Sequence, residues 1–220
     1  MKKPILLFAM LFFTQIVFGQ TKAVTENGDS VILYEDGTWD HIPFLDTMFG
    51  LVVDDDTDTT EEFNIPLNPE FFKKSADATF LLKSKRLNVG VWLNQNEWTY
   101  KKAGGAKEYN ISNNRKGLYA LLITEKTSIP VELLVEAALI NAKKAATDIK
   151  IIKQEYRFVN GQQVFMMQMS GIINEIKYHF NGYYYSNKNG SVQLVVTSIE
   201  SIAKKNNKDI EKFLNGFVEI

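Results

Sequence analysis

The stretch from residue 117 to 171 constrains the fold of this chain more than any other. It begins with a nearly all-apolar run at 118–124, which is typical of a strand buried on both faces. After Pro130, apolar side chains recur at helical spacing, so the sequence predicts a helix that packs against a sheet. An Asn-Gly hairpin follows the helix. Strand, helix and hairpin in this order indicate an α+β domain.

The Asn160-Gly161 pair fixes the register of the hairpin. A two-residue turn of this composition is the strongest short hairpin signal, because both residues adopt positive φ readily. The turn predicts that Tyr156 lies opposite Phe165. The resulting pairing places one set of apolar side chains on a single face, namely Ile152, Tyr156, Phe158, Phe165, Met167 and Met169.

The remaining elements predict an antiparallel sheet between helices. Two strands precede the central stretch, at 79–82 and 87–93, and two follow it, at 172–185 and 192–199. Residues 207–215 predict a short terminal helix that ends at Gly216. The fold class is therefore α+β, with a curved antiparallel sheet sandwiched by helices (αβα), an N-terminal β-hairpin and an acidic linker.

The N-terminus has the composition of a secretory signal peptide. Two lysines precede an apolar run too short and too interrupted for a comfortable membrane span. Val17 and Gly19 satisfy the small-residue rule for cleavage before Gln20. We expect residues 1–19 to be removed and the chain to be exported, to the periplasm or beyond, with no membrane span left. A membrane anchor is the alternative.

Two segments separate this signal from the main domain. Residues 20–43 carry Asn-Gly and Asp-Gly turn pairs and predict a small two-stranded β-hairpin module. Its DGTW sequence at 36–39 is similar to a short module of exported bacterial proteins. Residues 44–75 predict an acidic, proline-containing linker, with six carboxylates between 54 and 62. Calcium binding is an alternative there, although the spacing departs from the EF-hand pattern.

Charge is divided unevenly along the chain, and cysteine is absent. Between residues 20 and 70, thirteen acidic side chains stand against one basic side chain, whereas residues 71–220 hold 22 basic and 13 acidic ones. The acidic segment is either a solvated linker or a segment that docks on the lysine-rich domain. Without cysteine the chain has no disulfides, no thiolate metal site and no thiol nucleophile.

Residues 76–220 resemble the PsbP-like αβα sandwich superfamily. The resemblance rests on element order and loose motifs: VGVWLNQNEW at 89–98, LYALLITE before Pro130, NGQQVFMMQMSG, GYYYSNKNGSVQLVVTS and the closing IEKFLNGF. That superfamily includes accessory proteins and exported bacterial proteins and has no invariant catalytic signature. The resemblance therefore implies an accessory or binding protein rather than an enzyme.

No catalytic constellation or cofactor motif is visible in the sequence. The best candidate surface for a partner is aromatic and comprises Trp92, Trp98, His179, Tyr183 and Tyr185. If this face is open, alanine at either tyrosine leaves the fold intact. If the terminal helix covers it, the tyrosines belong to the core.

We therefore expect a non-enzymatic accessory or binding protein of the bacterial cell envelope. Its partner would be an envelope protein or a small ligand, not a nucleic acid, because the lysines are scattered and the chain is exported. No cofactor and no metal are expected. The alternatives are a hydrolase whose site assembles only in three dimensions, and a calcium-binding module. A deep pocket that holds His179 beside an acid would favour the hydrolase.

Overall fold

The computed structural model describes residues 65–104 and 107–220, together with three short strands nearer the N-terminus. These strands are β1 (Thr21–Val24), β2 (Ser30–Leu33) and β3 (Trp39–His41), and they form an antiparallel sheet in the order β1-β2-β3. The expected two-stranded hairpin is thus a three-stranded unit. The signal peptide at 1–19 and the acidic stretch at 54–62 lie outside the described residues.

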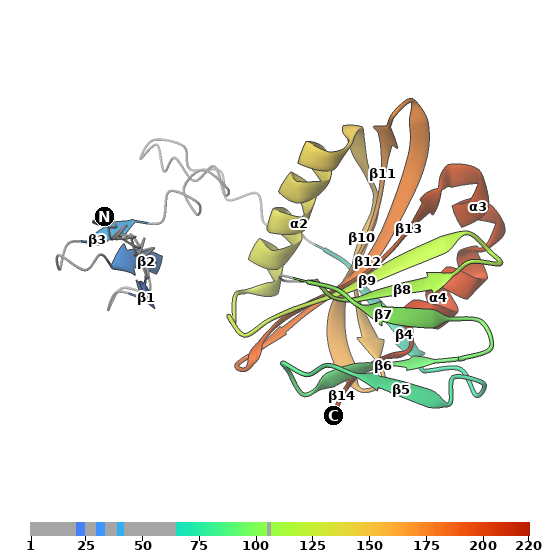
Figure 1. Cartoon of the computed structure of the whole chain (residues 1–220), viewed down its shortest axis with the longest axis horizontal. Coiled ribbons are helices and arrows are strands. Elements are labelled where there is room, and N and C mark those ends of the chain that lie inside the picture. Colours follow the sequence, from blue (N-terminus) through green and yellow to red (C-terminus); the bar gives the residue numbers. More distant parts are fainter. Residues whose placement is uncertain (1–20, 25–29, 34–38, 42–64, 105–106) are drawn as a thin grey trace, which may run out of the picture. The chain divides into compact units, whose positions relative to one another are not determined.

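The main domain is built on an eight-stranded sheet with the order β4-β10-β11-β12-β13-β9-β8-β7 (Figure 1). All neighbours are antiparallel except β4 and β10, which run parallel. The strands are β4 (Leu67–Phe72), β7 (Thr99–Lys102), β8 (Lys107–Asn113), β9 (Leu118–Glu125), β10 (Thr147–Val159), β11 (Gln162–Ile173), β12 (Ile176–Asn187) and β13 (Gly190–Ile199).

A second, three-stranded sheet and three helices complete the domain. The small sheet has the order β14-β6-β5, and the sequence did not predict it as a separate layer. Figure 1 shows α2 on one side of the large sheet and α3 and α4 on the other. The bounds are β5 (Phe80–Lys83), β6 (Val89–Leu93), β14 (Phe217–Glu219), α2 (Val131–Ala145), α3 (Glu200–Lys205) and α4 (Asn207–Leu214).

Two apolar cores lie on opposite faces of the large sheet. The smaller one joins Leu134, Val135 and Ala138 of α2 to Phe165 and Met167 of β11. The larger one joins the sheet to α4 and the small sheet, with Ile210, Phe213 and Leu214 of α4 among its buried members. The predicted α+β sandwich is confirmed. Because both faces are covered, the central strands are apolar on both sides.

The Asn160-Gly161 hairpin forms with the predicted register. Both turn residues have positive φ, 49° and 88°, and Tyr156 lies opposite Phe165. A second tight turn at Asn174 and Glu175 also has positive φ at both positions, 47° and 67°. This turn was not predicted from the sequence, because it contains no glycine. The predicted strand at 172–185 therefore begins too early, since residues 172 and 173 end β11.

The acidic and proline-containing linker ends earlier than predicted. Residues 67–72, placed in the linker at 44–75, form β4 at the edge of the large sheet. Pro69 is compatible with this position, because an edge strand has one side on which no backbone N–H is needed. The carbonyl oxygens of Pro66 and Phe72 accept hydrogen bonds from the backbone of Tyr156 and Asn160, both at 2.9 Å. The domain therefore begins before residue 76.

A buried carboxylate ties the loop after β5 to the large sheet. Glu108 of β8 is 7% exposed and accepts hydrogen bonds from Ser84 Oγ and Thr124 Oγ1, both at 2.6 Å, and from the Lys85 amide at 2.5 Å. Burial alone raises the pKa of a carboxyl, but these hydrogen bonds outweigh it and hold the pKa of Glu108 below its usual value of 4.5. The ionised form is thus the one that the fold stabilises.

Replacing Glu108 with glutamine is expected to lower the free energy of unfolding by about 1–3 kcal/mol at pH 7, because the amide cannot accept all three hydrogen bonds. The native contribution is complete above the unfolded pKa and is lost as pH falls through the lower folded pKa. Urea denaturation at pH 7 and at pH 3 should therefore show a smaller acid-induced loss in the variant. The exposed Glu70→Gln substitution is the matched control, and an equal effect there would contradict this role.

Candidate functional site

Three of the five aromatic and histidine candidates are buried. Trp98, Tyr183 and Tyr185 are 4%, 1% and 8% exposed, respectively. The Trp98 ring stacks on Phe213 of α4, with 4.0 Å between ring centroids. The expectation of an exposed aromatic patch is therefore wrong for these three residues. The alternative that the tyrosine face is covered is confirmed, because α4 and the small sheet pack on it.

Trp92 lies at a different place on the domain. It is partly buried beside Lys74, whose Nζ is 4.8 Å from the ring centroid. Together with Phe71, which is 75% exposed, it lines a recess of about 430 Å³. Trp92 and His179 therefore do not share a surface cleft with each other: the recess that His179 lines is formed by other residues.

The face of the large sheet that carries the larger core changes from apolar to polar along four adjacent strands. Its apolar end packs under α4, and its polar end lies near α3 and the start of α4. In order towards the polar end, the residues are Val159, Arg157, Glu155 and Lys153 on β10; Val164, Met166, Gln168 and Ser170 on β11; Tyr185, Tyr183, Asn181 and His179 on β12; and Val192, Leu194, Val196 and Ser198 on β13.

The polar end of this face forms a cleft with the two helices. Two adjoining recesses, of about 240 and 290 Å³, share Gln168 and Asn181 on the sheet and Asn207 on α4. Each recess alone is slightly smaller than the roughly 300–1,000 Å³ of a small-molecule site, so a ligand would occupy the two together. Arg157 and His179 line the two ends. We refer to the two recesses together as the polar cleft.

Two side chains on the floor of this sheet face have hydrogen-bonding groups without partners. Asn181 is 4% exposed, and no hydrogen bond joins its amide to any described residue. Ser198 is 2% exposed, and its buried Oγ has no partner among the described residues. Buried polar groups are nearly always paired. Asn181 lines both recesses, so its amide can bond to water or to a ligand there, whereas Ser198 lines neither recess. Gln168, directly opposite Asn181 on β11, likewise has a free amide.

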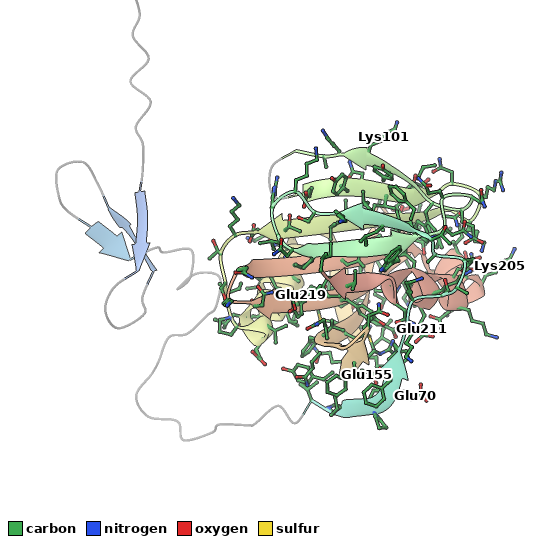
Figure 2. All side chains as sticks on the ribbon, turned by 90° about the horizontal axis from the view of Figure 1, so that it is seen from below. Glu70, Lys101, Glu155, Lys205, Glu211 and Glu219 are labelled. Atoms are coloured by element: carbon green, nitrogen blue, oxygen red, sulfur yellow. The ribbon has the colours of Figure 1, made fainter. Side chains whose placement is uncertain are left out.

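A charged network closes the end of the cleft near α4. The Arg157 side chain, 8% exposed, donates to Glu155 at 2.5 Å, to Glu211 at 3.0 Å and to the Tyr183 hydroxyl at 3.1 Å. Figure 2 shows the labelled Glu155 and Glu211 on neighbouring parts of the domain. Burial raises the pKa of Tyr183 to about 12, so its hydroxyl stays protonated and donates to Asn215 Oδ1 at 2.6 Å. Arg157 is thus fixed by partners on three elements.

His179 at the other end does have an acidic neighbour. Its Nε2 lies 3.3 Å from Glu200, but the same carboxylate oxygen also binds Lys177 and Lys204, each at 3.1 Å. Hydrogen bonds from Lys204 and then Lys177 lower the pKa of Glu200 to about 2. Ser170 and Ser198 lie opposite His179 on the neighbouring strands, yet no hydrogen bond among the described residues joins either hydroxyl to the imidazole. The arrangement lacks the nucleophile–base contact of a hydrolytic triad.

Sequence reasoning missed the centre of the cleft. It grouped His179 with the aromatic candidates, whereas the strand face of His179 carries the larger core at its other end. Gln168, Asn181 and Arg157 were not among the predicted site residues. The available signal was the alternation within each strand, in which polar residues replace apolar ones at equivalent register positions on three neighbouring strands. Recognising it required the pairing of strands that are separated by a turn the sequence did not reveal.

The described part of the chain holds neither a metal-ligating cluster nor a helix able to span a membrane. Among the described residues, no three His, Cys, Asp or Glu side chains cluster so that they could hold a metal ion. The carboxylates at 54–62, for which calcium binding was the alternative, lie outside those residues. None of the helices in the described part has the length and apolar character needed to cross a membrane.

Comparison with known proteins shows similarity in structure only. No family model matches the chain, and no curated protein matches its sequence. Among solved structures, cyanobacterial PsbP (CyanoP) from Synechocystis sp. PCC 6803 is 10% identical with a TM-score of 0.52, covering 66% of this chain and 95% of its own. LpqN of Mycobacterium tuberculosis, described as involved in cell envelope biogenesis, is 8% identical with a TM-score of 0.43. The match covers 62% of this chain and 86% of the LpqN chain.

PA94 from Pseudomonas aeruginosa, a protein of unknown function, is 11% identical with a TM-score of 0.42, covering 63% of this chain and 95% of its own. Of the three similarities, the one to PsbP carries the assignment of fold. The large mixed sheet, the small sheet and the helices on both faces agree with it. The main domain of this chain has a PsbP-like α+β fold.

Proposed function

We propose that this chain is an exported, non-enzymatic binding protein of the bacterial cell envelope, and that the polar cleft is its binding site. The observation that carries the proposal is the Asn181 side chain, which is buried in the cleft with a free amide. A core position between Tyr183 and His179 on a central strand would be more stable with an apolar residue. A polar residue without a partner there is explained by the ligand that it binds.

Two further features support this proposal. The N-terminal sequence has the composition of a signal peptide, and the PsbP-like fold is one that hosts accessory proteins. The charged groups beside the cleft are paired with one another, as in a rigid binding site. The cleft thus offers shape and hydrogen bonds without a reactive group.

The Asn181→Leu variant tests this function. Leucine has nearly the same shape but no amide, so we expect the free energy of unfolding to stay unchanged or to rise by up to about 1 kcal/mol. Small molecules that copurify with the wild-type chain from an envelope extract should be lost, as read by native mass spectrometry. The matched control is Gln193→Met, because Gln193 lies opposite Tyr184 on the other face of the sheet.

If the Asn181→Leu variant retains the same small molecules, the cleft is not their binding site. A loss of stability above about 1 kcal/mol would show instead that the amide is structural. Hydrolysis is the second candidate, favoured by the His179–Glu200 pair. Turnover of a simple ester such as p-nitrophenyl acetate that disappears in both His179→Asn and Ser198→Ala would overturn the non-enzymatic proposal.

A further inference from the structure

The free hydrogen-bonding capacity of the polar cleft is uncharged. Gln168 and Asn181 are directly opposite each other on β11 and β12, and both line the two recesses. Each amide has one carbonyl oxygen that accepts and one NH₂ group that donates twice. The cleft thus presents donors and acceptors side by side, with no net charge at its centre.

The charged groups at both ends of the cleft already take part in ion pairs. Lys153 contacts Glu155 at 2.9 Å, and Lys204 contacts Glu200 at 3.1 Å. Arg157 is held by Glu155 and Glu211. An anion that entered the cleft would have to compete with these carboxylates for their cations and would be repelled by them. At the Arg157 end, where two cations meet two carboxylates, this arrangement does not favour an anion. At the His179 end, Glu200 is shared by Lys177 and Lys204.

We infer that the polar cleft binds a small neutral molecule that carries several hydroxyl groups, of about the size of a monosaccharide. Each hydroxyl both donates and accepts, which matches the two opposed amides. The two recesses, of about 240 and 290 Å³, have room for a ligand of this size. This inference rests on the proposed function, because it names the ligand class for the same site.

The side-chain NH₂ signals of Gln168 and Asn181 in nitrogen-15 NMR spectra provide a direct test on the purified full chain. The neutral probes are glucose and N-acetylglucosamine, and the anionic probes are phosphate and citrate. We expect the neutral probes to shift both NH₂ signals, and the affinity to change little between low and high salt because no charge is bound. Gln168→Met should weaken binding by about tenfold, as loss of one hydrogen-bonding partner does. Gln193→Met should not.

The outcomes separate this inference from the proposed function. If phosphate or citrate shifts the two NH₂ signals with a salt-dependent affinity while the sugars do not, the ligand is an anion: the inference is wrong and the binding function survives. If none of the four probes shifts them, the neutral polyhydroxylated class is refuted. The copurification experiment with Asn181→Leu then decides independently whether the cleft binds any other small molecule.

Discussion

Replacing Arg157 with alanine is expected to lower the free energy of unfolding by about 3–5 kcal/mol, because it leaves Glu155 buried without its main partner. Glu155 is 5% exposed, and once Arg157 is removed it retains only Lys153 at 2.9 Å and Asn68 at 3.3 Å. The Lys153 side chain is itself 48% exposed and contributes little. Urea denaturation of the two proteins at pH 7 measures the difference.

The cost of Arg157→Ala should depend on pH in a defined direction. Burial alone raises the pKa of Glu155, but hydrogen bonds from Lys153 and Arg157 outweigh it and hold the pKa below 4.5. The stabilisation is complete above the unfolded pKa and is lost as pH falls through the folded pKa. The difference between wild type and variant should therefore shrink at pH 3, where a protonated Glu155 no longer needs a cation.

Two variants serve as controls for this prediction. Lys212→Ala breaks an ion pair with Asp77 that is exposed on both sides, so it should cost about 1 kcal/mol or less. Arg157→Lys keeps the charge but loses the planar fork that reaches Glu155, Glu211 and Tyr183 together, so it should remain destabilising. If Arg157→Ala costs no more than Lys212→Ala, the buried network does not stabilise the fold.

Replacing Tyr183 with alanine should cost about 3–5 kcal/mol, the range for removal of a large buried aromatic side chain. Tyr183 is 1% exposed in the larger core, and its hydroxyl bonds to Asn215 and Arg157. Tyr183→Phe keeps the ring and loses these hydrogen bonds, so it should cost about 1–2 kcal/mol. Thermal or urea denaturation gives both values.

Tyr119→Ala is the matched control, because that tyrosine is 59% exposed on β9 of the same sheet. It should change stability by about 0.5 kcal/mol or less. The exposed-patch interpretation of the sequence makes the opposite prediction, in which alanine at Tyr183 leaves the fold intact. Equal effects of Tyr183→Ala and Tyr119→Ala on stability would support the exposed-patch interpretation.

Much of the scaffold was predictable because its signals are local. The spacing of apolar residues after Pro130 specified α2, and the Asn160-Gly161 pair specified the turn and with it the opposition of Tyr156 and Phe165. The terminal helix with Ile210 inward followed from the same periodicity. In each case neighbouring residues suffice, since turn conformation and helical spacing depend on few positions.

Other elements were not predicted from the sequence, because they form through pairing with segments far away in the chain. β4 was placed in a linker, and only its parallel pairing with β10, more than 80 residues later, makes it a strand. The turn at Asn174 and Glu175 adopts positive φ without a glycine, because the pairing of β11 with β12 imposes it. Long-range pairing overrides local preference at these positions.

The candidate site also divides into what the sequence determined and what only the tertiary structure decided. Composition by itself determined that the chain has no disulfide and no thiol chemistry, and the order of elements determined its α+β fold. Only the tertiary structure decided that Tyr183 and Tyr185 are core residues while Gln168 and Asn181 face a cleft. All four alternate on strands in the same way. Which end of a strand is covered depends on where α3, α4 and the small sheet pack, and that is set by contacts between segments distant in sequence.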